Sequence, residues 1–430
     1  INGSNAGTVS AILVNGFSGI ENLTGGSGSD SFQFNTPGVL SGAVNGGAGA
    51  DTILGDNAAR NFNITGANAG TIGTLLGTGF TNVENLQGGS AVDSFTFGPG
   101  SSLSGTVTGG AGNDTLTGDN VGRTYSVTGS DAGTVVGLSA FTGIENLVAG
   151  SGPDSLVRSP SGSLSGTFDG RGGSDTADLS PQTVAQAVFL TGSNSEGFSA
   201  SLAGMGLAKG LDQIVATSKN NDQVVGLGVA SAWQVKAGAN QTYYRRTTTG
   251  ETLYLTGFEQ MFGNAATDAY NVDFSAGVPI GSAGLTLNGA GGSDSINVIG
   301  TAVADSFSIV VGTIAVNGRT IKHSAMENIA VRGGNGADTF VAGIGLPVGL
   351  ALLELFGDAG NDFAKVVPST NTKIVFNGGT GTDRLRVDTT QSGAPLLNPP
   401  PGVLSGTYFF AIHKPIDFLS VETREFGAVP

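Results

Sequence analysis

Short runs in which apolar and polar residues alternate recur along the whole chain, and glycine-rich segments separate them. Residues 31–34 (SFQF) and 94–97 (SFTF) are two of these runs. Strict alternation puts one side chain inside and the next outside, as a β-strand does. Gly, Ser, Thr, Asn and Asp interrupt nearly every longer window, and these residues disfavour helices. The pattern therefore predicts an all-β fold made of short strands.

A longer unit repeats along the chain: an apolar strand, a glycine-rich turn that closes with aspartate, and a second short strand. Its first copy occupies residues 19–34 (GIENLTGGSGSDSFQF). The aspartates that close this turn in three copies are 63 and 61 residues apart, namely Asp30, Asp93 and Asp154. A second turn follows each of them after 21 residues and closes with Asp51, Asp114 and Asp175. Because 63 is three times 21, the spacing predicts a coil of about 21 residues and a superrepeat of three coils.

A parallel β-solenoid accounts for this spacing, because identical positions then stack directly above one another. We predict about twenty right-handed coils, which at roughly 4.8 Å per coil give a rod on the order of 95–100 Å long. Residues 1–180 are predicted to form regular superrepeats, 181–280 degenerate coils, and 281–430 further coils of a single continuous rod. An inserted domain at 180–256, where the doubled glycines vanish, is the alternative.

The composition supports an ordered protein with many tight turns. Glycine makes up 74 of the 430 residues, and glycine reaches positive φ without steric cost. The apolar content of 39 % is too high for a disordered linker. A formal charge of −15 argues against binding to nucleic acid or to anionic membrane surfaces. No apolar run reaches the roughly 18 residues that a membrane span needs, so no membrane insertion is predicted.

The turns at residues 46–51 (GGAGAD) and 378–383 (GGTGTD) follow the pattern Gly-Gly-x-Gly-x-Asp. This pattern resembles the hemolysin-type calcium-binding (RTX) nonapeptide. The resemblance implies that aspartates and turn carbonyls coordinate Ca²⁺, a hard cation that takes about six to eight oxygens, between stacked turns. The candidate calcium ligands are Asp30, Asp51, Asp93, Asp114, Asp338, Asp362 and Asp383. The family places its nonapeptides in tandem, whereas these turns are 21 or more residues apart, so each resembles half a site.

A capping role is the alternative to calcium binding, because an aspartate at the end of a glycine turn commonly caps the amides of that turn. Asparagines in the strand before each turn fit a stacked amide ladder: Asn22, Asn85, Asn146 and Asn328. The glutamates beside them alternate with apolar residues and are expected to face solvent: Glu21, Glu84, Glu145 and Glu327.

The second half of the chain repeats the same order of strands and turns, at residues 304–309 (ADSFSI), 326–329 (MENI) and 338–340 (DTF). These segments resemble the β-strand repeats of giant bacterial surface proteins of the hemagglutinin-type adhesin, S-layer or extracellular matrix type. The resemblance implies a secreted protein with a structural or adhesive role.

The side chains that enzymes use are sparse. His323 and His413 are the only histidines, and neither belongs to a Ser/His/Asp or zinc-site spacing. We therefore predict that the chain is not an enzyme. One aromatic and basic group is a candidate sugar-binding patch, with a plain surface ridge as the alternative: Trp233, Tyr243, Tyr244 and Arg245.

These observations favour an extracellular structural repeat protein that assembles head to tail with copies of itself into a filament or surface layer. One alternative is a stalk segment of a large secreted adhesin. A second is a β-helix that binds or acts on polysaccharides, with cell-surface glycans as its partners. The chain starts in the middle of a repeat unit, and we expect it to be processed or cut from a longer polypeptide. Calcium is the one cofactor that the sequence suggests.

Overall fold

The computed structural model describes residues 1–9, 13–239, 241–281, 283–396, 399–400 and 402–427. The secondary structure of these residues consists of strands and turns, which confirms the all-β prediction. Within them no helix is long and apolar enough to cross a membrane. The chain divides into two compact units, unit 1 (Ile1–Ser218) and unit 2 (Lys219–Pro430).

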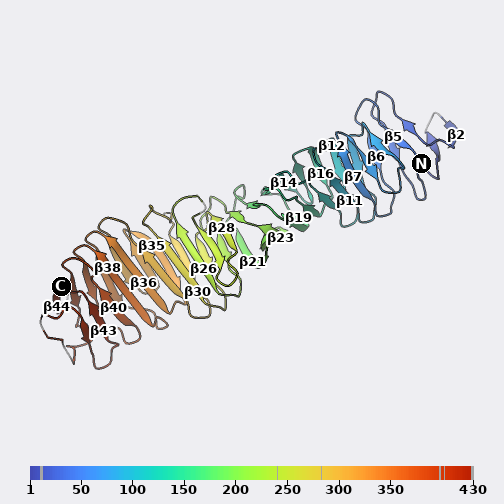
Figure 1. Cartoon of the computed structure of the whole chain (residues 1–430). Coiled ribbons are helices and arrows are strands. Elements are labelled where there is room, and N and C mark those ends of the chain that lie inside the picture. The colour runs from blue at the N-terminus through green and yellow to red at the C-terminus, as the bar shows by residue number, and fades with distance from the viewer. Residues whose placement is uncertain (10–12, 240, 282, 397–398, 401, 428–430) are drawn as a thin grey trace. The chain divides into compact units, whose positions relative to one another are not determined.

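Unit 1 contains two ladders of mainly parallel strands, between which the chain alternates (Figure 1). The first ladder consists of β3 (Leu23–Thr24), β5 (Ala43–Asn45), β7 (Asn61–Gly66), β8 (Ala69–Ile72), β9 (Gly79–Thr81), β11 (Ser94–Phe97), β13 (Thr115–Thr117), β17 (Asn146–Val148), β19 (Leu164–Asp169), β21 (Ala187–Asn194), β22 (Gly197–Leu202) and β23 (Met205–Leu211). The second consists of β4 (Ser31–Gln33), β6 (Thr52–Leu54), β10 (Asn85–Gln87), β12 (Leu103–Thr108), β14 (Thr124–Gly129), β15 (Ala132–Val135), β16 (Leu138–Thr142), β18 (Ser155–Arg158), β20 (Thr176–Asp178) and β24 (Gln213–Val215). A separate antiparallel pair is formed by β1 (Ala6–Val9) and β2 (Leu13–Ser18).

Unit 2 has the same two-ladder construction. Its first ladder consists of β25 (Gln223–Val225), β29 (Gln260–Phe262), β31 (Leu285–Asn288), β33 (Ser306–Val310), β34 (Thr313–Val316), β35 (Arg319–Ser324), β37 (Thr339–Ile344), β39 (Phe363–Val366), β41 (Arg384–Val387) and β44 (Thr423–Phe426). Its second ladder consists of β26 (Ser231–Lys236), β27 (Tyr243–Arg246), β28 (Thr252–Thr256), β30 (Asp268–Asp273), β32 (Ser295–Ile299), β36 (Asn328–Asn335), β38 (Leu352–Ala359), β40 (Lys373–Asn377), β42 (Gly406–Tyr408) and β43 (Ile416–Leu419).

Parallel neighbours pair residues at the same repeat position. Phe32 pairs with Ile53, and Phe95 with Leu116, and the two residues of each pair are 21 positions apart. The chain thus returns to the same ladder after one coil, as it does in a β-solenoid. The solenoid architecture that the spacing predicts is therefore present in the described residues.

Several coils are longer because they contain an antiparallel meander of three strands. Ile53 pairs with Leu86, 33 residues later, across the coil that contains β7, β8 and β9. Ala177 pairs with Ile214, 37 residues later, across the coil that contains β21, β22 and β23. The 63-residue superrepeat therefore combines 21-residue coils with longer ones, instead of the three equal coils that the spacing suggests.

The meanders alternate between the two ladders along the chain. In unit 1 the strands β7–β9 and β21–β23 belong to the first ladder, and β14–β16 belong to the second. In unit 2 the strands β26–β28 belong to the second ladder and β33–β35 to the first. Each meander adds extra strands to one ladder. Because successive meanders belong to alternate ladders, both ladders receive extra strands along the chain.

Columns of stacked apolar side chains fill the space between the ladders. In unit 1 the ring of Phe62 stacks on that of Phe95 one coil later, with centroids 4.6 Å apart. In unit 2 Phe307 stacks on Phe340 at 4.9 Å. All four side chains are fully buried, so the alternation seen in the sequence places its apolar members inside.

Residues 181–280, predicted as degenerate coils, supply the strands from β21 to β30. Parallel pairing continues through them, with Phe168 opposite Ala208 in unit 1 and Trp233 opposite Tyr270 in unit 2. These residues lack doubled glycines, but their strands occupy regular places in the ladders.

Candidate functional site

The predicted calcium ligands lie in columns that run from coil to coil. The main-chain N–H of Asp30 donates a 2.7 Å hydrogen bond to Oδ1 of Asp51. The N–H of Asp51 in turn donates to Oε2 of Glu84 at 2.8 Å. Each acidic side chain thus accepts a hydrogen bond from the acidic residue one coil earlier. We call these columns the acidic ladder.

The acidic ladder occurs in short runs in both units. In unit 1 the runs are Asp30–Asp51–Glu84, Asp93–Asp114–Glu145 and Asp154–Asp175–Asp212. In unit 2 they are Asp222–Glu259, Asp268–Asp294–Glu327 and Asp305–Asp338–Asp362–Asp383–Glu422. All seven predicted calcium ligands belong to these runs.

A steric requirement explains the first glycine of the Gly-Gly-x-Gly-x-Asp turn. A Cβ added to Gly46 would lie 2.5 Å from Oδ2 of Asp51, and one added to Gly109 would lie 2.5 Å from Oδ2 of Asp114. Real Cβ atoms do not approach other atoms so closely, so the carboxylate takes the space that a side chain would need. A carbonyl oxygen lies closer still, that of Asn82 to the Cβ added to Gly46 and that of Gly143 to the Cβ added to Gly109. Both the backbone and the aspartate therefore require the glycine.

The second carboxylate oxygen is found in two different environments. Oδ2 of Asp93 accepts a 2.8 Å hydrogen bond from the N–H of Gly89, four residues earlier. Oδ2 of Asp114 is buried and has no hydrogen-bond partner. The difference is in the backbone: Gly110, four residues before Asp114, has a φ of 110°, whereas Gly89 is outside the left-handed region. The left-handed conformation leaves the carboxylate without this donor.

The same rule divides the aspartates of the acidic ladder that close a glycine-rich or related turn. Those whose Oδ2 accepts the N–H four residues earlier are Asp30, Asp93, Asp154, Asp268 and Asp305. Those whose buried Oδ2 has no partner follow a residue with positive φ four positions earlier: Asp51, Asp114, Asp175, Asp294, Asp338, Asp362 and Asp383.

Burial makes several of the unpaired aspartates weak acids. It raises the pKa of Asp114 and Asp294 to about 6, and that of Asp175 and Asp338 to about 7. Removing a carboxylate from water disfavours its charged form, and one main-chain donor compensates only in part. Neighbouring acids of the ladder add a smaller repulsion in the same direction.

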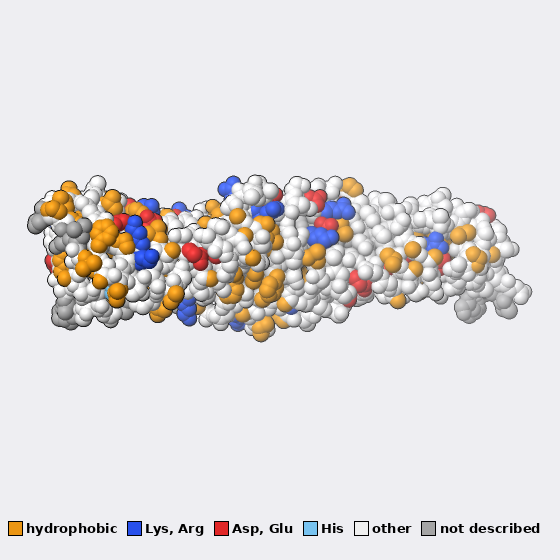
Figure 2. Space-filling view, turned by 90° about the horizontal axis from the view of Figure 1, so that it is seen from below, with side chains coloured by type: hydrophobic (Ala, Val, Ile, Leu, Met, Phe, Trp, Pro, Cys, Tyr) orange, Lys and Arg blue, Asp and Glu red, His pale blue; other side chains and the backbone are white. Residues whose placement is uncertain are grey.

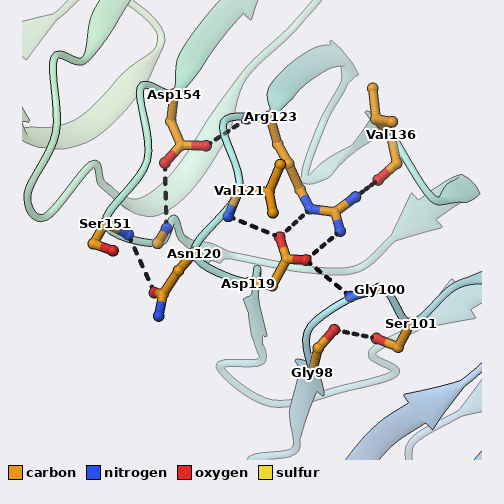
Figure 3. Close-up of polar contacts among 11 residues, drawn as sticks. Gly98, Gly100, Ser101, Asp119, Asn120, Val121, Arg123, Val136, Ser151 and Asp154 are labelled. Atoms are coloured by element: carbon orange, nitrogen blue, oxygen red, sulfur yellow. Dashed lines mark hydrogen bonds and ion pairs between the residues drawn. The ribbon is translucent and has the colours of Figure 1, made fainter.

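An arginine on the preceding coil hydrogen-bonds to the first aspartate of a run of the acidic ladder (Figure 3). The guanidinium of Arg123 binds both carboxylate oxygens of Asp119, at 2.6 and 2.8 Å. The main-chain N–H of Arg123 donates to Oδ1 of Asp154 at 2.7 Å. The arginine holds the pKa of Asp119 below its ordinary value. Arg60 and Asp56 repeat this ion pair one superrepeat earlier.

The ladder geometry shows these aspartates as caps of main-chain N–H groups. Calcium takes about six to eight oxygen ligands. In the part of the chain that the structure describes, no three His, Cys, Asp or Glu side chains gather where they could hold a metal ion. One oxygen of each predicted ligand except Asp30 also accepts a main-chain N–H from a neighbouring coil. Calcium binding at these residues therefore stays a prediction.

Of the four glutamates that were expected to face solvent, Glu21 is exposed, whereas the other three are half-buried members of the acidic ladder. Glu84, Glu145 and Glu327 accept the main-chain N–H of Asp51, Asp114 and Asp294 respectively. Each glutamate lies two residues after a position with positive φ, namely Asn82, Gly143 and Ala325. The asparagine and the glycine at two of these positions could have indicated this backbone conformation from the sequence, because both residue types tolerate positive φ.

The predicted asparagine ladder also bonds to the backbone. Oδ1 of Asn22 accepts the N–H of Ala43 at 2.8 Å. Oδ1 of Asn85 accepts the N–H of Thr106 at 2.9 Å. Asn146 makes the equivalent bond to Thr167, so these amides link consecutive coils instead of stacking on one another.

The four residues of the predicted sugar-binding patch point in two directions. Trp233 and Tyr244 are 1 % and 0 % exposed, and the ring of Trp233 stacks on that of Tyr270 in the core. Tyr243 is half-buried and Arg245 is exposed. Trp233 and Tyr244 pair directly across β26 and β27, so strand alternation turns Tyr243 and Arg245 to the outer face.

No family model matches the chain, and no curated protein matches it. The resemblance to RTX-type repeats and to bacterial surface proteins therefore stays a prediction from the residues quoted above.

Proposed function

We propose that this chain is an extracellular structural module whose coils add end to end, and that copies of it associate head to tail into a filament or surface layer. The observation that supports this best is the stacking of the coils, in which parallel strands pair at the same repeat position. β44 is the last described strand of its ladder and hydrogen-bonds to β41. An unpaired edge is a template for a further strand.

Exposed apolar side chains gather around this edge. Of the seventeen exposed large hydrophobic side chains among the described residues, seven lie between residues 396 and 426. They are Leu396, Val403, Leu404, Phe409, Ile412, Leu419 and Phe426. Figure 2 shows hydrophobic side chains concentrated at this end, on the left of the view. Exposed apolar surface beside a strand edge is suited to being covered by another chain.

The first coil of unit 1 offers a complementary surface. A pocket of about 400 Å³ is lined by the apolar side chains of Phe17, Leu23 and Phe32, among others. Strands β3 and β4 each pair with one described strand, β5 and β6 respectively. A hollow on one surface and projecting side chains on another are what a heterologous, propagating contact requires.

The hand of the solenoid and its number of coils are also part of this proposal. We take the coils to be right-handed, which is the usual hand of parallel crossovers, and about twenty in number. The regular use of side chains to cap neighbouring coils suits a mechanical role better than catalysis. His323 agrees with this, because it is buried in the core and burial lowers its pKa to about 4.

A stalk segment of a larger adhesin is the second candidate. The stacking of the coils favours it equally, because further coils of the same polypeptide would pair in the same way as a second copy. The two candidates differ in whether the isolated chain associates.

Sedimentation velocity and negative-stain electron microscopy of residues 1–430 test the proposal. We expect particles that lengthen with protein concentration. Ile412→Lys, at the apolar end, should abolish this growth, whereas Val348→Lys, at an 82 % exposed loop residue, should leave it unchanged. Single particles of the unmodified chain at all concentrations would overturn self-assembly and leave the stalk role.

A further inference from the structure

The outer face of the second ladder in unit 2 has a row of two tyrosines and three carboxamides. The row runs across adjacent strands β28, β27, β26, β30 and β32. Its members pair in register from strand to strand, and we call it the amide row: Tyr254, Tyr243, Gln234, Asn271 and Asn297.

Hydrogen bonds join the three carboxamides, but some of their N–H donors are left without an acceptor. Nδ2 of Asn297 donates to Oδ1 of Asn271 at 2.6 Å, and Nδ2 of Asn271 donates to Oε1 of Gln234 at 2.7 Å. Nε2 of Gln234 is buried and has no hydrogen-bond partner. A buried amide donor without an acceptor is rare and costly, so the fold alone does not satisfy all the polar groups of the row.

A pocket of about 240 Å³ lies along the amide row. Ala232, Ala269 and Ser295 occupy the neighbouring row of the same strands, and their small side chains leave the space open. Tyr243 lines the same pocket, and its ring meets that of Tyr254 edge to face at 6.4 Å. The residues that line this pocket include no charged side chain.

The fold itself does not demand amides at this place. In unit 1 the strands that follow the equivalent meander in the second ladder are β18 and β20. The row through Ser126 of β14 continues there with Val157 and Asp178. In unit 2 the amide row gives way to Ala330 on the next strand, β36. The carboxamides are therefore a local feature of β26, β30 and β32.

We propose that the amide row and its pocket bind an uncharged polysaccharide. A sugar ring has an apolar C–H face, which packs on an aromatic ring, and hydroxyl groups that both donate and accept hydrogen bonds. Tyrosine and carboxamide side chains supply the matching surfaces. Nδ2 of Asn271 and of Asn297 each has a second N–H, which can donate to a hydroxyl oxygen of a sugar in the pocket. The exposed Arg245 pairs with Ala232 beside the pocket, but the pocket lining is uncharged and the chain carries a formal charge of −15, which favours a neutral polymer over an acidic one.

The site differs from the patch predicted from the sequence. Tyr243 is common to both, and Trp233 also lines the pocket although its ring is buried against Tyr270. Tyr244 serves the core, and the carboxamides of Gln234, Asn271 and Asn297 form the rest of the outer face. The proposal does not depend on self-assembly, because the row lies on the side of the strands and away from the edge of β44.

Affinity electrophoresis tests the proposal. Residues 1–430 are run in native gels that contain dextran, barley β-glucan or galactomannan, and in a control gel that contains polygalacturonate. We expect retardation by at least one neutral polymer and none by polygalacturonate. Tyr243→Ala and Asn297→Ala should weaken binding about tenfold or more. Asn63→Ala, at an exposed outer position of β7 in unit 1, is the matched control and should bind as the unmodified chain does.

Two results would overturn the proposal. One is the absence of retardation in every neutral gel, or retardation by polygalacturonate alone. The other is equal retardation of Tyr243→Ala, Asn297→Ala and the unmodified chain, which would make the amide row structural. Thermal melts of each variant establish that it is folded, so lost binding is not confused with lost structure.

Discussion

The main-chain N–H of Asp93 donates a 2.7 Å hydrogen bond to Oδ1 of Asp114, which lies 21 residues later in the chain and one coil away in space. Both residues are fully buried. The side chain that closes one glycine turn thus caps the backbone of the turn before it. Because this bond recurs through the acidic ladder, changes to single turns should have predictable effects on stability.

Replacing aspartate by asparagine should separate the two classes of ladder residue. In Asp93 both carboxylate oxygens accept main-chain N–H groups, from Arg60 and Gly89. Asp93→Asn must place an NH₂ group against one of these donors, and we expect a loss of about 1–3 kcal/mol in the free energy of unfolding. Asp114→Asn should cost less, because Nδ2 then replaces an oxygen that accepts nothing. Urea denaturation measures both, and equal losses would contradict the division.

Alanine scanning of the turn glycines should distinguish steric from permissive positions. A Cβ on Gly109 would overlap the carbonyl oxygen of Gly143 and lie 2.5 Å from Oδ2 of Asp114. Gly109→Ala should therefore destabilise the chain by about 1–3 kcal/mol or more. Gly172 is the matched control, because no atom lies within 4 Å of its added Cβ and its φ is not positive. Gly172→Ala should be neutral in the same denaturation experiment, and similar losses in both would refute the steric explanation.

Stability should fall as the pH rises from about 4 towards 8. The pKa values of Asp175 and Asp338 are raised to about 7, so between the unfolded value near 3.9 and about 7 the folded chain binds more protons than the unfolded chain. The free energy of unfolding therefore decreases with pH in this window. His323 acts in the opposite sense between about pH 4 and 6.5, because burial lowers its pKa to about 4. Asp119 also acts in the opposite sense, but its lowered pKa places its effect below about pH 4. The four aspartates whose pKa is raised to about 6 or 7 outweigh the one histidine.

Melting temperatures at pH 5 and pH 8 measure this effect, and the value at pH 5 should be higher. Asp338→Asn removes one of the titrating groups and should reduce the difference between the two. A melting temperature that rises from pH 5 to pH 8 would contradict the protonation of the buried aspartates.

Calcium should have little effect on stability if capping is the role of the aspartates. Main-chain N–H groups already occupy one oxygen of Asp51 and Asp383, and no described cluster of side chains suits a metal. We expect the melting temperature in millimolar Ca²⁺ and in chelator to agree within about 1 °C, since only a ligand bound to the folded state stabilises it. A rise of several degrees that Asp51→Asn or Asp383→Asn removes would instead establish the RTX-like calcium role.

Much of the local structure was predictable because it depends on near neighbours. Alternating segments such as residues 31–34 and 94–97 form strands with their phenylalanines inside. The glycine-rich turns and the aspartates that close them were equally visible. The meanders were missed, because antiparallel strands such as β7 and β8 show the same short alternation as the parallel strands around them.

The candidate sites were predictable only in part. The acidic residues could be recognised, but the two environments of Asp93 and Asp114 depend on the backbone conformation of a residue four positions earlier. The exposed and buried members of the aromatic cluster could not be separated either. The alternation of inward and outward side chains is equally regular whether Trp233 or Tyr243 is taken as an inward residue. Only the pairing of β26 with β30 places Trp233 against Tyr270 in the core.

The sequence by itself determined the strands, the turns and the 21-residue spacing, because these follow from alternation and from glycine conformations within a few residues. Only the tertiary structure decided which strand lies over which. That choice pairs residues as far apart as Ala177 and Ile214, so it rests on the combined packing and hydrogen bonding of many distant strands. The caps of the acidic ladder and the outward face of the amide row follow from this register, since both need side chains from separate coils to meet.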